Sequence, residues 1–262
     1  MKLIVENWNK FVSEGIEDEK HNLKYYAFDW DDNIAQMPTK IILLDKSGNE
    51  VGMDTESFAH YRGMIGKEEF DFDGVVIKDF ASEPFRNFRV AGDGQFLKDI
   101  MYAETAPAWN DFVECINSAS IFAIITARGH KPSTLKRAVY KYIISNHDGI
   151  DSGEVIKNIR KYNKIFEKTG KDASIRGYLD LCKFYPVSFG PSALMASPEQ
   201  AKVNALREFV QYCEKLNKGM PIKVGFSDDD KRNIDLIEKH FSEPRELSTM
   251  TIKYTGKQHG EE

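Results

Sequence analysis

Three short apolar runs along the chain predict buried β-strands, and each run ends in polar residues. The runs are "LKYYAF" before "DWDD", "SIFAII" before "TARG", and "PIKVGF" before "SDDD". Apolar stretches of this length, bounded by polar residues, are typical of strands rather than of helices. The sequence therefore predicts three buried strands with polar or acidic ends.

Between these strands, apolar residues recur at helical spacing. The periodicity predicts helices within residues 106–119, 132–144, 155–166, 197–216 and 234–241, and a short amphipathic helix near residues 3–12. The helix at 197 has a clear start signal. Ser197 is a good N-cap, Pro198 suits the first helical position, and Gln200 completes a capping box.

Strands that alternate with helices predict an α/β fold with a mostly parallel sheet. Residues 39–53 contain two apolar runs around "SGN", which predicts a β-hairpin, whereas residues 56–105 show no sustained periodicity. In open parallel sheets, ligands bind outside the carboxyl ends of the strands. If the three strands are neighbours, we expect their polar ends to converge on one site.

Composition limits the classes of protein that are compatible with this pattern. The chain of 262 residues can form one core with an inserted subdomain, or two small domains. Its net charge of -5 gives no global basic field for nucleic acid or an acidic membrane, although local basic patches are compatible with it. Three separated cysteines without a CxxC pair favour a reducing compartment and no disulfide-linked partner. With neither a signal peptide nor an apolar membrane span in the sequence, we expect a cytoplasmic protein.

The residue types at the predicted strand ends suit phosphate chemistry. Clustered carboxylates without histidine or thiolate neighbours favour a hard cation such as Mg²⁺. A carboxylate is also able to attack phosphorus and form an aspartyl-phosphate. Transfer of a phosphoryl group requires positive charge on its oxygens, which a Mg²⁺ ion and a lysine supply.

The order of these residues resembles the haloacid dehalogenase superfamily. "AFDWDDNI" is similar to its first motif, although Asp32-Asn33 stands where the family has Gly-Thr. "IITARG" resembles the second motif, Lys202 matches the third, and "GFSDDDKRNI" matches the fourth. The resemblance implies a Rossmann-like, three-layer α/β/α domain with a mostly parallel sheet. It covers most of the chain, and the second acid of the first motif is typical of the phosphatase branch.

The resemblance also implies roles for individual residues. Asp29 is the expected nucleophile, and Asp31 is the expected general acid and base. The expected phosphate-binding residues are Thr126, Ala127 and Lys202. The expected Mg²⁺ site is formed by Asp29, Asp31 through its backbone carbonyl and Asp228 as the direct ligand of the fourth motif, with Asp229 as a secondary one. The implied activity is that of a Mg²⁺-dependent phosphomonoester hydrolase.

Some assignments have alternatives at this stage. Three other lysines compete with Lys202: Lys157, Lys183 and Lys223. In the fourth motif, Asp228-Asp229 fits an adjacent pair, whereas Asp229 with Asn233 fits a wider spacing. Arg128 has two interpretations. It is a candidate substrate contact that binds phosphate, or it is a surface charge.

The long segment between Asp31 and Thr126 predicts an insertion. In the superfamily that the chain resembles, an insertion at this place forms a cap over the active site. We therefore expect a core of residues 1–35 and 105–262 and an inserted flap and small cap of residues 36–104. The stretch "PFRNFRV" within it offers cations and aromatic faces to a nucleotide or nucleic-acid end, or else its phenylalanines belong to a core.

Three functions are compatible with the sequence. The first is a phosphatase whose substrate is a nucleotide, a polynucleotide 3'-phosphate or a small phosphorylated metabolite. The second is a catalytically silent binding or scaffold protein that has kept the fold. The third is a response-regulator-like receiver, which is disfavoured because no lone aspartate follows a middle strand.

Overall fold

The computed structural model describes residues 24–170, 172–190, 197–217, 221–242 and 250–256. The expected helix near residues 3–12 and the last six residues of the C-terminal tail lie outside these ranges. None of the described helices is long and apolar enough to cross a membrane. All three cysteines are buried and unpaired with one another.

The main sheet has five parallel strands. Their order is β11 (Met250–Tyr254), β10 (Lys223–Asp228), β1 (Lys24–Phe28), β8 (Ile121–Thr126) and β9 (Lys183–Pro186). The three strands expected from the apolar runs are therefore confirmed, and they are neighbours. The edge strands β9 and β11 were not predicted. Because the chain moves outward from β1 in both directions, the strand order reverses between β1 and β10.

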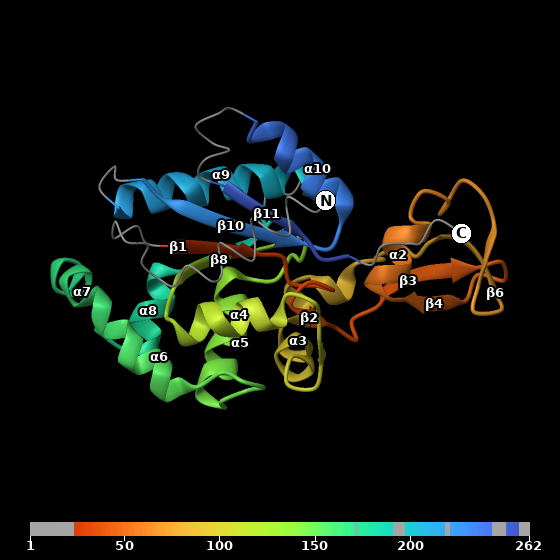
Figure 1. Ribbon diagram of the computed structural model, residues 1–262. Helices are drawn as coiled ribbons and strands as arrows, with labels where there is room; N and C mark the ends of the chain where they lie inside the picture. The colour runs from red at the N-terminus through yellow and green to blue at the C-terminus, as the bar shows by residue number, and fades with distance from the viewer. Residues whose placement is uncertain (1–23, 171, 191–196, 218–220, 243–249, 257–262) are drawn as a thin grey trace.

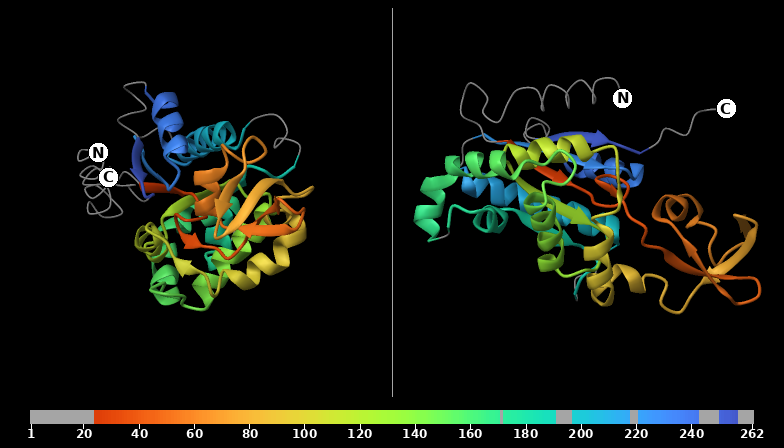
Figure 2. Two further views of the ribbon diagram at one scale, coloured as in Figure 1. Left: turned by 90° about the vertical axis from the view of Figure 1, so that its right-hand side faces the viewer. Right: turned by 90° about the horizontal axis from the view of Figure 1, so that it is seen from below.

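Helices cover both faces of the main sheet, as Figures 1 and 2 show. One face carries α9 (Pro198–Leu216) and α10 (Lys231–His240). The other carries α4 (Trp109–Asn117), α5 (Pro132–Ile144), α6 (Ser152–Ile159) and α8 (Ile175–Leu181). Every residue of β1 and β8 is buried between these layers. The structure thus confirms a mixed α/β fold with a parallel sheet flanked by helices.

One of the predicted helices differs from the structure, and α8 was not predicted. The segment expected as one helix over residues 155–166 is broken into α6, a short 3₁₀ turn (Arg160–Tyr162) and α7 (Asn163–Thr169). At the start of α9, Ser197 caps the helix by accepting from the backbone N–H of Gln200, as its sequence indicates. The side-chain amide of Gln200 donates to Asn204.

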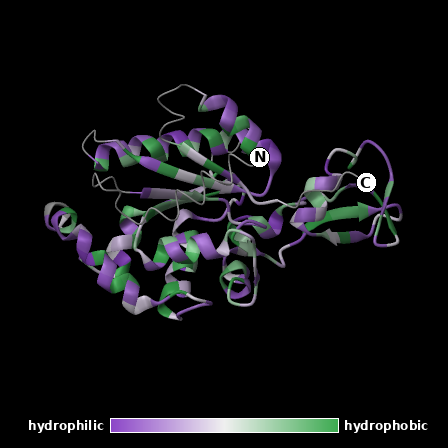
Figure 3. Cartoon of the chain, viewed as in Figure 1, coloured by the Kyte–Doolittle hydropathy of each residue, from purple (hydrophilic) through white to green (hydrophobic). Residues whose placement is uncertain are grey.

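A second, antiparallel sheet forms a small lobe at the end of the main sheet (Figures 1 and 2). Its strand order is β4 (Glu50–Met53), β3 (Ile41–Asp45), β6 (Val75–Phe80) and β5 (Phe70–Phe72), with α2 (Thr55–Tyr61) beside it. The predicted hairpin is the β3–β4 pair. The lobe has its own apolar cluster, which includes Leu43 and Ile77, and the hydrophobic positions of β3 are visible in Figure 3.

The rest of the expected insertion packs elsewhere. Two short strands, β2 (Ala35–Gln36) and β7 (Glu104–Thr105), pair antiparallel where the chain leaves and re-enters the main domain. After two 3₁₀ turns (Arg86–Phe88 and Val90–Gly92), α3 (Asp93–Asp99) buries Phe96 in the main core. The separate lobe therefore comprises the second sheet, α2 and the segment after β6 that packs Phe85 and Phe88 against them.

Candidate functional site

Two of the predicted acids lie side by side at the point where the strand order reverses. Asp29 directly follows β1, and Asp228 ends the neighbouring strand β10. The backbone N–H of Asp29 donates to the carbonyl oxygen of Ser227 over 3.0 Å, which extends the strand pairing to the acids. Such a reversal point is where open parallel sheets bind ligands.

A tight turn follows Asp29 and is fixed by Asn33. Asp32 adopts a left-handed backbone conformation with φ of 55°, which aspartate tolerates better than most residues. The amide nitrogen of the buried Asn33 lies 3.1 Å from the Asp29 carbonyl oxygen and 3.2 Å from that of Ser227. Its amide oxygen accepts from Thr255 Oγ1 over 2.7 Å. In the sequence, Asn33 is recognisable only as a departure from the family motif. In the structure, its side chain joins the ends of β1, β10 and β11.

Lys202 connects the two acids. Its side chain is 3% exposed, and its Nζ lies 2.8 Å from Asp228 Oδ2 and 3.0 Å from Asp29 Oδ2. Burial alone would lower the pKa of Lys202, but Asp228 and Asp29 raise it above its usual value, so the ammonium group stays charged.

The three competing lysines lie away from these acids. Lys183 and Lys223 begin β9 and β10, at the strand ends opposite to the acids, and Lys157 is exposed on α6. Among the four candidates, the structure places Lys202 beside Asp29.

The second carboxylate oxygen of Asp29 is unusual. Oδ1 is buried and has no hydrogen-bond partner in the described part of the chain. Burial raises the pKa of Asp29 to about 8, with the charges of Asp228 and Asp31 adding to the increase and Lys202 opposing it. A cation bound beside this carboxylate would oppose the increase and favour the ionised form.

Asp229 completes a group of three carboxylates. One oxygen each from Asp29, Asp228 and Asp229 lies within 4.8 Å of the others. Burial, together with Asp228 and Asp29, raises the pKa of Asp229 well above its usual value. Three converging carboxylates, one of them with an unsatisfied buried oxygen, suit a hard divalent cation.

Asn233, which the alternative spacing in the fourth motif pairs with Asp229, binds Asp228 instead. Asn233 donates through its amide nitrogen to both carboxylate oxygens of Asp228, over 2.9 and 3.1 Å. It therefore orients Asp228, while Asp229 is the acid that joins Asp29 and Asp228. The carboxylate of Asp31 is not part of this group of three.

Asp31 is instead bound by Arg128. The guanidinium Nε lies 2.8 Å from Asp31 Oδ2, and Nη2 lies 2.6 Å from Oδ1. Arg128 is 1% exposed and stacks between the rings of Phe88 and Phe96, at 4.7 and 4.9 Å from their centroids. The interpretation of Arg128 as a surface charge is wrong, because its side chain is buried and binds the carboxylate of Asp31.

His130 extends this network away from the site. Its Nε2 lies 3.1 Å from Arg128 Nη1, and its Nδ1 lies 2.8 Å from Asp93 Oδ1. Burial and the charge of Arg128 lower the pKa of His130. A neutral ring that donates from Nδ1 to Asp93 and accepts at Nε2 from Arg128 satisfies both contacts.

The predicted phosphate-binding residues of the second motif follow β8, next to β1. Thr126 is buried, and its Oγ1 accepts from the backbone N–H of Arg128 over 3.2 Å. Ala127 is exposed. The same turn thus exposes Ala127 and places the Arg128 side chain in the interior.

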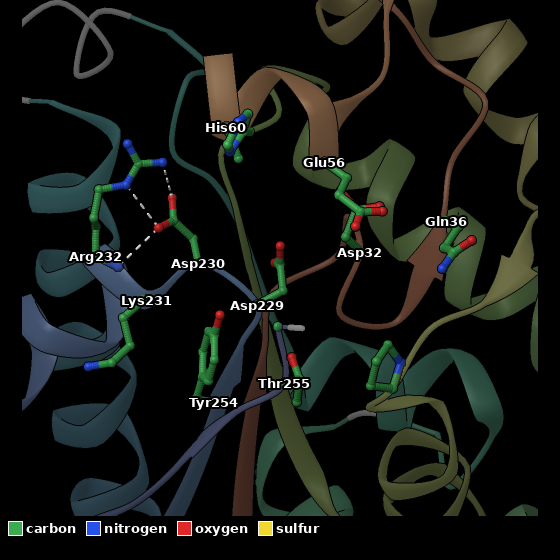
Figure 4. Close-up of a pocket in the computed structure, with 13 residues that line it drawn as sticks. Asp32, Gln36, Glu56, His60, Asp229, Asp230, Lys231, Arg232, Tyr254 and Thr255 are labelled. Atoms are coloured by element: carbon green, nitrogen blue, oxygen red, sulfur yellow. Dashed lines mark hydrogen bonds and ion pairs between the residues drawn. The ribbon is translucent and has the colours of Figure 1, made fainter. Parts of the chain in front are cut away.

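A cavity of about 330 Å³ adjoins Asp229, between the main domain and α2 of the small lobe (Figure 4). Asp32 and Glu56 lie on one wall, and Asp230 and Arg232 lie on the other. Burial raises the pKa of Asp32 to about 6; a hydrogen bond from Thr55 opposes this, whereas Asp31 and Glu56 add to it. The cavity volume is in the range of small-molecule sites.

The aromatic and basic residues of "PFRNFRV" do not line this cavity. Phe85 and Phe88 pack in the cluster of the small lobe, Arg86 pairs with Glu50 at 2.6 Å, and Arg89 donates to the Ser188 carbonyl oxygen. The structure thus places the two rings in the small-lobe core, which is the second of the two interpretations of this stretch.

Comparisons with family models, with curated proteins and with solved structures found no match for the chain. A functional assignment therefore depends on the site geometry and on the sequence motifs.

Proposed function

We propose that the protein is a Mg²⁺-dependent phosphomonoester hydrolase that acts through an aspartyl-phosphate on Asp29. One observation carries this proposal. Asp29 has one carboxylate oxygen 3.0 Å from a buried ammonium group and the other buried without a partner. A carboxylate held at one oxygen and unpartnered at the other is suited to act as a nucleophile.

The residues around Asp29 fit the remaining steps. Asp29 Oδ1 would form the bond to phosphorus as the ester oxygen leaves, and Asp31 would give that oxygen a proton and later take one from water. Lys202, Thr126 and the backbone at Ala127 would hold phosphate oxygens. Asp29, Asp228 and Asp229 would hold Mg²⁺, with the backbone carbonyl of Asp31 as the further ligand that the family resemblance implies. When bound, the ion would neutralise charge on the phosphoryl oxygens.

The strand order supports the finer fold assignment within this proposal. Numbered along the chain, the five parallel strands are ordered 3-2-1-4-5, which is the order of a Rossmann-like sheet. The small lobe would act as the cap, because its helix α2 contributes Glu56 and His60 to the wall of the cavity beside Asp229. A cytoplasmic location and a phosphorylated small molecule or nucleotide as partner remain part of the proposal.

One observation favours the alternative of a catalytically silent protein with this fold. Both carboxylate oxygens of Asp31 accept hydrogen bonds from Arg128. An acid catalyst must place one of these oxygens against the leaving group, and a purely structural Asp31–Arg128 pair has no such need.

A phosphatase assay distinguishes the two functions. The purified protein is assayed with p-nitrophenyl phosphate and with a panel of phosphorylated metabolites, nucleotides and a 3'-phosphorylated oligonucleotide, with Mg²⁺ and with chelator. We expect Mg²⁺-dependent release of phosphate, lowered by at least about a thousandfold in Asp29→Asn. Asp148→Asn, in an exposed loop, is the matched control and should keep full activity. A well-folded Asp29→Asn protein within tenfold of the parent would overturn the proposal.

A further inference from the structure

A buried arginine fixes the orientation of the Asp31 carboxylate. Arg128 binds it at two points, through Nε to Oδ2 and through Nη2 to Oδ1. A two-point contact between a guanidinium group and a carboxylate fixes the plane of the carboxylate as well as its position. The Asp31 side chain is partly exposed, whereas that of Arg128 is fully buried. The orientation of Asp31 is therefore determined by the position of the guanidinium group.

The guanidinium group is held in turn by residues of the inserted segment. Thr39, which follows β2, accepts from Arg128 Nη2 over 3.0 Å. The rings of Phe88 and Phe96, which lie between β6 and β7, stack on the guanidinium group. The remaining nitrogen, Nη1, lies 3.1 Å from Nε2 of His130. The position of the arginine thus depends on whether this imidazole nitrogen accepts a hydrogen bond.

Asp93 lies at the other nitrogen of the same ring. It is the first residue of α3, which lies beside α5 (Figure 1). Its Oδ1 lies 2.8 Å from His130 Nδ1, and its Oδ2 accepts from Thr134 Oγ1 over 2.8 Å. A carboxylate accepts and does not donate, so it favours the neutral ring whose proton is on Nδ1. Nε2 then has a lone pair that accepts from Arg128.

We propose that Asp93 is a positioning residue, which orients the Asp31 carboxylate through His130 and Arg128. The proposal rests on the proposed function, because it takes Asp31 as the acid that protonates the leaving group. Without Asp93, the proton of His130 would move to Nε2, where it would face an N–H group of Arg128. Both of these side chains are buried, and a buried donor without an acceptor is unfavourable. Arg128 would therefore shift, and Asp31 would shift with it.

Two aryl phosphates of similar shape test this role. Phenyl phosphate and p-nitrophenyl phosphate differ mainly in the leaving group, and the phenolate of the first is the poorer one. Protonation of the leaving group therefore matters more for phenyl phosphate. In Asp93→Leu, we expect the ratio of kcat on phenyl phosphate to kcat on p-nitrophenyl phosphate to fall by at least about threefold. A loss of folded protein lowers both rates equally, so an unchanged ratio would overturn the proposal.

A conservative variant at the same position tests the hydrogen bond itself. Asp93→Asn keeps an oxygen that accepts from His130 Nδ1, and its amide nitrogen is able to donate to Thr134 Oγ1. The ratio of the two rates should therefore stay close to that of the parent. A ratio as low as that of Asp93→Leu would contradict the assigned role, because the acceptor for the ring is still present.

A second background tests whether Asp93 acts through the imidazole ring. His130→Gln keeps an acceptor for Arg128 but has no proton that moves between two ring nitrogens. In this background, Asp93→Leu should change the ratio of the two rates much less than in the parent. Equal effects in both backgrounds would show that Asp93 does not act through His130. Asp99→Leu, on the same helix, is the control and should leave the ratio unchanged, since the Asp99 carboxylate accepts from Gln95 over 2.7 Å.

An NMR measurement separates this inference from the phosphatase activity. The nitrogen signals of a histidine side chain distinguish the two neutral forms of the ring, and His130→Gln identifies the signals of His130 by their loss. We expect the proton on Nδ1 in the parent and on Nε2 in Asp93→Leu, and the same form in both proteins would overturn the proposal. Activity with an unchanged ratio in Asp93→Leu would reject the positioning role alone. No activity on any substrate would reject the proposed function, and the NMR signals would still decide whether Asp93 sets the form of the ring.

Discussion

The ammonium group of Lys202 lies 3.0 Å from Asp29 Oδ2 within a site where both side chains are buried. The same group lies 2.8 Å from Asp228, which is fully buried. One cation thus compensates two carboxylates inside the domain. Removal of one member of a buried ion pair costs more than the net contribution of the pair, because it leaves an uncompensated charge.

We therefore expect Lys202→Met to lower the free energy of unfolding by about 3–5 kcal/mol in chelator. Adding Asp228→Asn to the same protein should recover part of that loss, since one buried charge is then removed. Lys157→Met, on the exposed face of α6, is the control and should change stability by less than about 0.5 kcal/mol. Urea denaturation of the four proteins measures these differences. A loss no larger than that of the control would show that Lys202 does not compensate the acids.

The pairing of Asp31 with Arg128 gives a prediction on catalysis. Protonation of the leaving group matters most when that group is a poor one. Asp31→Asn should therefore lower kcat severely with an alkyl phosphate and much less with p-nitrophenyl phosphate.

Arg128→Lys should show the same substrate dependence in a milder form, because lysine keeps the charge but loses the two-point contact to Asp31. The ratio of the two rates within each variant is the measurement, so a change in the amount of folded protein cancels. Arg137→Lys, exposed on α5, is the control. Equal losses on both substrates would contradict the assignment of Asp31 as the acid.

The central part of the fold could be predicted because its signals are local. β1, β8 and β10 are buried, so their apolar runs stand out in the sequence, and the acids that follow them mark the strand ends. In a parallel sheet the carboxyl ends meet at one edge, which is sufficient to bring Asp29 and Asp228 together. The sequence spacing and the family resemblance were therefore sufficient to predict Asp29, Lys202 and Asp228 as site residues.

The edge strands and the second sheet lacked such signals. Every residue of β11 is half-buried, and the sequence "MTIKY" mixes polar with apolar residues. β5 has three residues, too few for a periodic pattern. The roles of Arg128 and Asn33 depend on partners 97, 194 and 222 residues away, so no pattern within a single element could reveal them.

The group of three carboxylates predicts a stabilising effect of Mg²⁺. A cation bound only by the folded state raises the free energy of unfolding with its concentration. The melting temperature of the parent protein should therefore rise across a Mg²⁺ titration from chelator.

Asp229→Asn is the best variant for this test. Asp228 also accepts hydrogen bonds from Lys202 and Asn233, so its removal would disturb the fold, whereas the Asp229 carboxylate has no hydrogen bond within the described residues. Asp229→Asn should be at least as stable as the parent in chelator, because a repulsive charge is lost, and should respond less to Mg²⁺. Asp148→Asn serves as the control. An identical response of Asp229→Asn and the parent would show that Asp229 binds no cation.

The buried His130 predicts a dependence of stability on pH. Burial and the charge of Arg128 lower its pKa in the folded state below the unfolded value of about 6.5. Below that pH the unfolded chain binds a proton that the folded protein does not, so the free energy of unfolding falls with falling pH until the folded pKa is reached. One such proton contributes at most about 1.4 kcal/mol per pH unit. Gln in place of His130 keeps an acceptor for Arg128 but does not titrate.

The stability difference between the parent and His130→Gln should therefore shrink between pH 7.5 and pH 5.5. Urea denaturation of both proteins in chelator at several pH values measures it. Other titrating groups, including Asp29 with its raised pKa, are common to both proteins and cancel in the difference. A difference that stays constant over this range would mean that His130 is protonated equally in the folded and unfolded states. The neutral ring between Arg128 and Asp93 would then be the wrong description of this network.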